Sequence, residues 1–249
     1  MIICKSPAEI EKLRRSGRMV RQVLGEIREQ ARPGITTLDL EKFVVKRLKE
    51  LGARPAFKGY RGYPCCLCAS VNDEVIHGIP SPRRMLKEGD ILSLDMGVVL
   101  DGYYGDSAIT VPVGATSESA QRLLKVTEEA LELALEKARL GNRLGDISAT
   151  VQEHAEKNGY SVVREFVGHG IGKAMHEEPQ IPNFGQAGHG PLLKAGMVLA
   201  IEPMVNAGGP AVRVLDDNWT AVTVDGKLSA HFEHMVAVTQ NGPDVLTRL

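Results

Sequence analysis

The sequence predicts an α+β domain built from two related halves, and three observations lead to this prediction. Expected helices and strands come in blocks rather than in strict alternation, which favours α+β over a doubly wound sheet. The chain of 249 residues is 43% hydrophobic and 24% charged, as in a globular protein with a well-filled core. In addition, a shift of 107 residues aligns two separate pairs of segments.

The repeat links matching turns and strands in the two halves. The shift aligns residues 31–34, Ala-Arg-Pro-Gly, with residues 138–141, Ala-Arg-Leu-Gly. The same shift aligns Leu86–Asp95 with Leu193–Glu202, each a turn followed by an apolar strand. One match could arise by chance, but two at a single offset indicate related halves. We therefore expect a single domain, 1–249, with halves of roughly 1–110 and 111–249.

Four helices are expected, two in each half. Ser6-Pro7-Ala8-Glu9 is a capping box with proline at the first helical position, so a helix begins there and runs to about Ala31. A second helix covers about 38–51. The second half opens with a long helix of about 117–139, followed by a shorter one of about 146–158.

Strands are expected where short apolar or alternating runs lie between turn residues. In the first half these runs lie near 66–71, 91–100 and 103–111. In the second half they lie near 161–167, 197–202, 211–215, 219–224 and 231–238.

Composition argues against several classes of function. Lys plus Arg is 30 and Asp plus Glu is 31, so the basic excess of a general nucleic-acid binder is missing. No apolar run approaches the ~18 residues of a membrane span, and early charges such as Lys5 and Glu9 argue against a signal peptide. Four cysteines do not suggest a disulfide scaffold, so a reducing cytoplasm is expected.

A predicted hairpin brings two aspartates together. Asp101-Gly102 is a strong two-residue turn between two apolar strands. This turn would pair Gly97 with Asp106, so Asp95 and Asp106 would lie diagonally on one face, with Cα atoms ~7–8 Å apart. Carboxylates that converge from this separation can hold two cations ~3.5–4 Å apart. Without cations they would repel, and one would take up a proton.

Two glutamates, like the two aspartates, lie in or directly after mostly apolar segments. Glu202 follows the apolar residues Met197–Ile201, and Glu233 lies in an apolar run that starts at His231. The repeat makes Asp95 and Glu202 counterparts. Each acid could be satisfied separately by an arginine or by backbone donors. Four such acids, two of them related by the repeat, instead favour a shared metal centre.

Histidines could add nitrogen ligands. His169 has a glycine on each side, which permits close backbone approach or positive φ, and His176 follows seven residues later. We expect both in loops. His77 could be a core, surface or functional residue, and Cys65-x-x-Cys68 lacks the second pair of a zinc site. An oxygen-rich ligand set with one histidine suits hard to borderline divalent ions.

The ordered motifs resemble those of the type I methionine aminopeptidases, which belong to the pita-bread metallohydrolases. The resemblance covers essentially the whole chain and favours the short bacterial form. It implies an α+β pita-bread fold with pseudo-two-fold symmetry, a central antiparallel sheet and outer helices. The motifs are Asn72…His77-Gly78-Ile79-Pro80, Asp95…Asp106, Gly168-His169-Gly170-Ile171-Gly172…His176-Glu177-Glu178-Pro179, Glu202-Pro203 and Glu233-His234.

The resemblance implies a site with two divalent metal ions, which could be Co, Mn, Fe, Zn or Ni. Asp106 and Glu233 would be shared by both ions, Asp95 would chelate one, and His169 with Glu202 would bind the other. The activity implied is removal of the N-terminal methionine from nascent proteins and peptides by hydrolysis of the first peptide bond. The residues 1–249 would then be a single catalytic domain.

The resemblance also implies roles around the metals. Glu202 would transfer a proton, His176 would stabilise the oxyanion, and His77 would hydrogen-bond near the scissile amide. A monovalent cation could lie near Asn72 and Ser229. Met175 and Phe57 depart from the family pattern, where an aromatic and a smaller residue are common, respectively. The residues expected around the methionine side chain are Tyr60, Tyr63, Cys68 and Trp219.

The expected partners are nascent polypeptide N-termini at the ribosome, with no specific nucleic acid and no membrane, and the expected state is a monomer. Two alternatives remain open. A prolidase or creatinase-like enzyme of the same fold would carry an additional N-terminal domain. A catalytically silent binding module would have lost metal ligands, whereas all five are present here.

Overall fold

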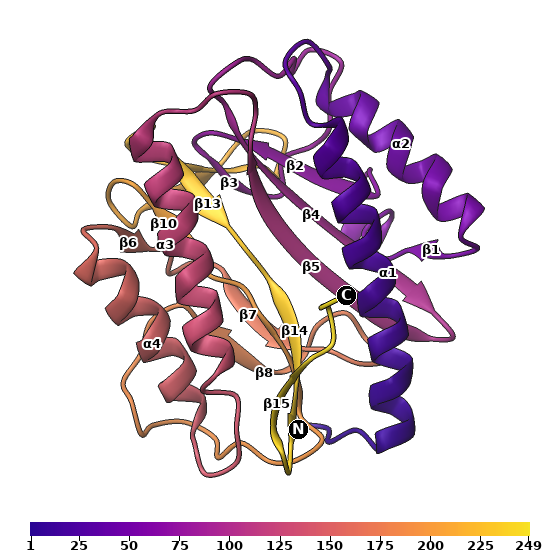
Figure 1. Ribbon diagram of the computed structural model, residues 1–249, viewed down its shortest axis with the longest axis vertical. Helices are drawn as coiled ribbons and strands as arrows, with labels where there is room; N and C mark the ends of the chain where they lie inside the picture. Colours follow the sequence, from indigo (N-terminus) through magenta and orange to yellow (C-terminus); the bar gives the residue numbers. More distant parts are fainter.

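The computed structural model describes all 249 residues and contains four α-helices among short antiparallel sheets (Figure 1). The helices are α1 Pro7–Gln30, α2 Thr37–Glu50, α3 Glu118–Leu135 and α4 Leu144–Lys157, with a 3-10 turn at Tyr60–Gly62. The strands of the first half are β1 Arg54–Pro55, β2 Leu67–Val71, β3 Glu74–Ile76, β4 Ile91–Leu100 and β5 Tyr103–Pro112. The later strands are β6 Ser161–Val162, β7 Val167–Gly170, β8 Glu177–Pro182, β9 Val198–Ile201, β10 Met204–Asn206, β11 Val212–Val214, β12 Ala221–Thr223, β13 Ser229–His231, β14 His234–Thr239 and β15 Gly242–Val245.

Helices α1 and α3 lie on the same side of the central strands, flanked by α2 and α4 (Figure 1). A Cβ atom at Gly105 of β5 would approach the backbone carbonyl carbon of Ser16 to 2.5 Å, so this residue faces α1. Successive residues of a strand point to opposite faces, and Asp106 therefore points away from the helix. The helices thus cover one face and leave the other for the site.

Two antiparallel sheets form the centre of the molecule. In the first, β4 pairs with β5 along its length and with β1 and β2 on its other edge. The second has the order β15-β14-β9-β7-β8. The two sheets meet where Ser107 Oγ donates to Glu233 O at 2.7 Å and Glu233 N donates to Ala108 O at 2.9 Å. This junction brings the carboxylates of both halves together.

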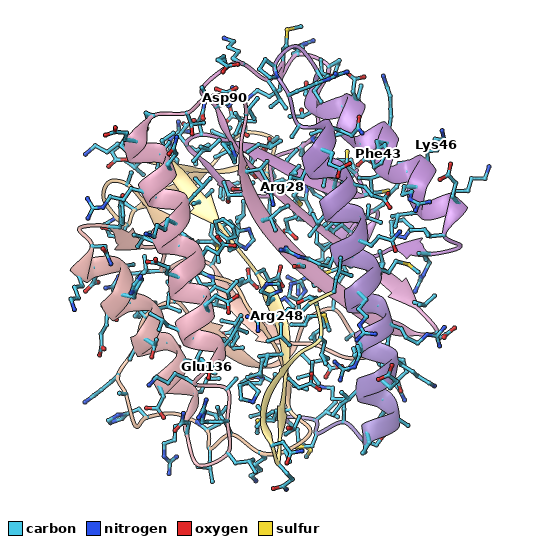
Figure 2. All side chains as sticks on the ribbon, viewed as in Figure 1. Arg28, Phe43, Lys46, Asp90, Glu136 and Arg248 are labelled. Atoms are coloured by element: carbon cyan, nitrogen blue, oxygen red, sulfur yellow. The ribbon has the colours of Figure 1, made fainter.

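A continuous hydrophobic core of 41 buried residues draws side chains from both halves, for example Val20, Leu94, Leu131 and Leu199. At the periphery, Figure 2 shows Lys46 projecting from α2, whereas Arg248 lies between α1 and α3. Arg248 forms an ion pair with Glu132 of α3. The structure contains no helix that could span a membrane.

The elements of the two halves keep the predicted offset. Helix α2 spans Thr37–Glu50 and α4 spans Leu144–Lys157, so both ends differ by 107 residues. The isolated β-bridges Thr36–Met85 and Arg143–Leu192 differ by the same number. These offsets support the division at roughly 110, which remains a prediction.

The predicted helices are all present, although the third ends at Leu135 rather than near 139. Two predicted strands were too long. The segment 161–167 contributes only β6 and the first residue of β7, since Glu165 and Phe166 leave the sheet to line the cavity described below. The segment 231–238 is divided at Phe232-Glu233, because β13 pairs with β10 and β14 pairs with β9.

The prediction that His169 lies in a loop was wrong, since it lies on β7 between β8 and β9. Its glycine neighbours permit close approach of other strands rather than a positive φ. A Cβ atom at Gly168 would be 2.5 Å from Ala200 O, and one at Gly170 would collide with Glu178 O. His176 does lie outside the strands, immediately before β8.

Candidate metal centre and active site

One cavity of about 300 Å³ contains every residue predicted for the metal site and the methionine pocket. It opens on the face of β4 and β5 that α1 leaves uncovered. The predicted residues that line it are Asp95, Asp106, His169, Glu202, Glu233, His77, His176, Tyr60, Tyr63, Cys68 and Trp219. Phe57 and Met175, the two positions that depart from the family pattern, also line the cavity. The remaining lining residues are Arg61, Ile76, Glu165, Phe166 and Val167.

The aspartates come from the predicted hairpin. Asp101 and Gly102 have φ of 51° and 79°, which are the left-handed values that a tight two-residue turn requires. Gly97 pairs with Asp106 and Asp95 pairs with Ala108, which confirms the predicted register. Both aspartates line the same cavity, and a slip of one residue would send one of them to the helix side.

The remaining acids and His169 complete the cluster from the other half. One donor atom from each of Asp106, His169 and Glu233 lies within 4.8 Å of the other two. His169 Nε2 is 3.6 Å from Glu202 Oε1 and 3.9 Å from Asp106 Oδ2. The ring is fixed through Nδ1, which lies 2.9 Å from Gly170 O, so Nε2 faces the acids.

The buried acids lack the partners that such groups normally have. Asp95 Oδ1, Asp106 Oδ1 and Glu233 Oε1 are buried and accept no hydrogen bond. Burial raises the pKa of Asp95 to about 8. The pKa values of Asp106, Glu202 and Glu233 are also raised, first by burial and then by the neighbouring carboxylates. These residues fit a site that binds divalent cations, because cations would neutralise this charge and engage the free oxygens.

Two further histidines flank the acids. Burial lowers the pKa of His77 to about 4 and that of His169 to about 3, and His176 is shifted in the same direction. All three are therefore neutral at pH 7. The Tyr60 hydroxyl lies 2.7 Å from His176 Nδ1. When this hydroxyl donates to Nδ1, the ring proton of His176 is on Nε2, where it can donate to a substrate.

An apolar subsite adjoins the acids. The rings of Tyr63 and Trp219 pack edge to face with centroids 5.0 Å apart. Cys68 lies opposite Asp95 in the β2–β4 pairing and is buried, as are Phe57 and Met175. This lining of aromatic rings and sulfur suits an unbranched thioether side chain.

Asn72 and Ser229 are neighbours, since Ser229 N donates to Asn72 O at 2.9 Å. The side chain of Asn72 is engaged with Asp90 and with the backbone of Ile91. A monovalent cation near this pair would therefore contact backbone oxygens rather than the Asn72 amide.

The sequence predictions omitted His231 and the residues at the mouth of the cavity. His231 is buried, and its Nε2 lies 3.7 Å from Glu202 Oε2. An unbroken strand over 231–238 would place His231 on the same face as Glu233, but the strand is interrupted at Phe232-Glu233, so this alternation does not identify His231. No comparable signal marks Arg61 or Glu165, which reach the cavity from a short 3-10 turn and from an irregular segment, respectively.

Comparisons with known proteins agree with this geometry. Residues 11–240 match the model of metallopeptidase family M24. The chain is 52% identical to a methionine aminopeptidase of Clostridium acetobutylicum over 99% of each chain. It is also 52% identical to methionine aminopeptidase 1 of Bacillus subtilis over 100% of each chain.

Solved structures give the same result. A methionine aminopeptidase from Thermotoga maritima superposes with a TM-score of 0.98 at 49% identity, covering 100% of each chain. The prolidase from Pyrococcus furiosus shares the fold alone, with a TM-score of 0.81 at 24% identity over 66% of that chain. The fold is thus the pita-bread fold of these enzymes, as predicted.

The fold and the family match define a metal-dependent peptidase, and the chain belongs to metallopeptidase family M24. Within that family, the relatives that match it over the full length and at about half identity are methionine aminopeptidases.

Proposed function

We propose that the chain removes the N-terminal methionine from proteins and peptides by metal-assisted hydrolysis of the first peptide bond. The observation that carries this proposal is the convergence of four buried acids and His169 beside a subsite suited to a thioether. Full-length similarity to methionine aminopeptidases supports the same activity. The acids supply a metal centre, and the subsite supplies selectivity for methionine.

Two divalent ions would be held by the five predicted ligands. Asp106 and Glu233 would contact both ions, Asp95 one of them, and His169 with Glu202 the other. Four carboxylates balance the charge of two divalent ions, and the orphaned oxygens of Asp95, Asp106 and Glu233 support this assignment. The donor set accommodates Co, Mn, Fe, Zn or Ni without selecting among them.

When bound, the ions would lower the pKa of a water molecule and polarise the substrate carbonyl. The side chains of the chain then complete the reaction. Glu202 accepts the proton of the attacking water and passes it to the leaving amine. His176 donates its Nε2 proton to the developing oxyanion, and His77 hydrogen-bonds near the scissile amide.

Selectivity for an N-terminal methionine would follow from two parts of the cavity, the apolar subsite and the side near Asp95. The methionine side chain would lie among Tyr60, Tyr63, Cys68 and Trp219. Its free α-amino group would lie on the side of Asp95, and this position restricts cleavage to the end of a chain. Phe57 and Met175 pack in the same hydrophobic cluster as Tyr63 and Cys68 and so contribute to this subsite.

The substrates are the N-termini of nascent polypeptides. We propose that the enzyme meets them at the ribosome in the cytoplasm and acts as a monomer of one catalytic domain. A monovalent cation near the backbone of Asn72 and Ser229 is part of the same proposal, supported by the contact between these residues.

Four peptides test the proposed function. The metal-reconstituted protein should release the first residue from Met-Ala peptides and leave N-acetylated Met-Ala peptides intact. Pro-Ala peptides, with or without the acetyl group, should not be cleaved. Cleavage of acetylated peptides would contradict the role of the free amine. A preference for Pro-Ala over Met-Ala would contradict the assigned methionine subsite.

A further inference from the structure

His231 is a buried side chain that makes no hydrogen bond. Only 2% of its surface is exposed, and neither Nδ1 nor Nε2 has a hydrogen-bond partner. A buried imidazole without partners is unfavourable, because the ring loses its hydrogen bonds to water and gains none. None of the roles assigned above uses this residue.

Hydrogen bonds hold the backbone of His231 in place. His231 N donates to Thr110 Oγ1 at 2.9 Å, and the same hydroxyl donates to His231 O at 2.7 Å. His231 also pairs with Met204 in the β10–β13 ladder. These contacts tie β13 to β5 and β10, and the Nε2 atom of the ring faces Glu202.

The two oxygens of Glu202 face different groups. Oε1 lies 3.6 Å from His169 Nε2, on the side of the other proposed ligands. Oε2 lies 3.7 Å from His231 Nε2. These are the ion-pair contacts of the Glu202 side chain, and it makes no hydrogen bond with any other residue.

We propose that His231 is a positioning residue that donates its Nε2 proton to Glu202 Oε2 and thereby keeps Oε1 available for a metal ion. This inference rests on the proposed function, because it concerns a ligand of the proposed metal centre. The gap of 3.7 Å is longer than a hydrogen bond and needs a small rotation of either side chain to close. Such contacts commonly tighten when a site is loaded.

The expected consequence is on metal affinity. Groups that hydrogen-bond to a metal ligand orient that ligand, and their removal typically weakens metal binding by ~10–100-fold. The ring of His231 does not line the cavity, so it contacts neither the proposed ions nor the substrate directly. We expect its effect on metal binding to pass through Glu202, whose carboxylate faces the ring.

Three variants separate hydrogen bonding from packing. In His231→Gln the amide nitrogen reaches about as far from Cβ as Nε2 does, so a donor to Glu202 is retained. In His231→Asn the amide nitrogen ends near the position of Nδ1 and cannot reach Glu202. In His231→Met the volume is approximately kept and the donor is lost.

Three measurements are made on each variant. Titration calorimetry with Co²⁺ measures metal affinity, the visible Co²⁺ spectrum reports coordination, and thermal unfolding without metal reports whether the variant folds.

We expect His231→Met and His231→Asn to bind Co²⁺ ~10–100-fold more weakly than the parent protein, with an altered visible spectrum. His231→Gln should bind within a few-fold of the parent. If His231→Met does not fold, the comparison of His231→Gln with His231→Asn carries the same test.

Equal affinity of the parent, His231→Asn and His231→Gln would overturn the inference, as would a folded His231→Gln that binds as weakly as His231→Asn. A parent protein that binds no Co²⁺ would overturn the proposed metal centre itself. The two failures are therefore distinguishable.

Discussion

Glu202 has the most demanding role of any single residue, because it is proposed both to bind a metal and to transfer a proton. Glu202→Gln retains the shape and a weaker ligand oxygen but cannot accept the proton. Turnover on a Met-Ala peptide should fall by ~10²–10⁴, which is typical for loss of a general base. Metal content measured on the same sample provides the control. Near-normal turnover at full metal content would refute the proton-transfer role.

His176 should affect catalysis far more than metal binding. Its Nδ1 is engaged with Tyr60, and its Nε2 is free to donate into the cavity. His176→Ala should retain metal and lose ~10²–10³ in turnover, the usual cost of an oxyanion donor. His189→Ala, at an exposed loop position, is the matched control and should be unchanged. Loss of metal from His176→Ala would identify His176 as a ligand.

At the residue scale, sequence reasoning identified the acids because each interrupts an apolar strand. An ionised carboxylate is costly to bury, so its position alone suggests a function. His231 was missed because a single buried histidine is more ambiguous than a buried acid. Arg61 and Glu165 were missed because short turns and irregular segments have no periodicity from which the direction of a side chain can be predicted.

At the element scale, the β4–β5 hairpin positions the site. Gly105 marks its close contact with α1, and the exposed Gly25 of α1 serves as the control. Gly105→Ala would place a Cβ atom 2.5 Å from the carbonyl carbon of Ser16, so α1 would have to move. We expect a loss of ~1–3 kcal/mol in unfolding free energy. Gly25 lies within α1 with no atom near its Cβ position, so Gly25→Ala should stabilise by up to ~1 kcal/mol. Denaturant unfolding of both variants measures these opposite effects. Changes of the same sign in the unfolding free energies of the two variants would contradict the close packing of Gly105 against α1.

The hairpin could be predicted because its turn residues and its apolar strands give one consistent register. Strand β8 could not be predicted, because its sequence, Glu-Glu-Pro-Gln-Ile-Pro, contains two prolines and no regular alternation of apolar and polar residues. The glycines around His169 were interpreted as loop signals, although they serve close strand pairing. Short strands of this kind depend on their neighbours in the sheet rather than on local propensity.

At the scale of the whole molecule, the repeat explains how one site receives acids from both halves. Asp95 and Glu202 lie 107 residues apart, as do the ends of α2 and α4. We propose that the halves 1–110 and 111–249 form one domain around this centre. The repeat was visible in the sequence, whereas the contact between Ser107 and Glu233 that joins the sheets was not.

The clustered acids should make the metal-free protein less stable as the pH rises. In the folded state Asp95 keeps its proton up to a pKa of about 8, and burial raises the pKa of Asp106, Glu202 and Glu233 as well, whereas the unfolded chain releases all four protons near their ordinary pKa values. The folded state therefore binds more protons in this range, and the free energy of unfolding decreases with pH. Histidines with lowered pKa values oppose this trend only below the ordinary value of 6.5.

Between about pH 6.5 and 8, we expect the free energy of unfolding to fall by about 1.4 kcal/mol per pH unit for each proton that the folded state retains and the unfolded chain has released. Denaturant unfolding across this range measures it. Added divalent metal should abolish the trend, and Asp95→Asn should flatten it in the metal-free protein. Unfolding free energy that rises with pH in the metal-free protein would contradict the proposed charge balance of the site.

Five side chains from both halves are proposed to bind two divalent ions beside a methionine subsite. The most direct test is an anomalous difference map from crystals grown with Mn²⁺. Two peaks are predicted, both in contact with Asp106 and Glu233, one also with Asp95 and the other with His169 and Glu202. A single peak, or peaks that leave Asp95 or Glu202 without a contact, would contradict the account.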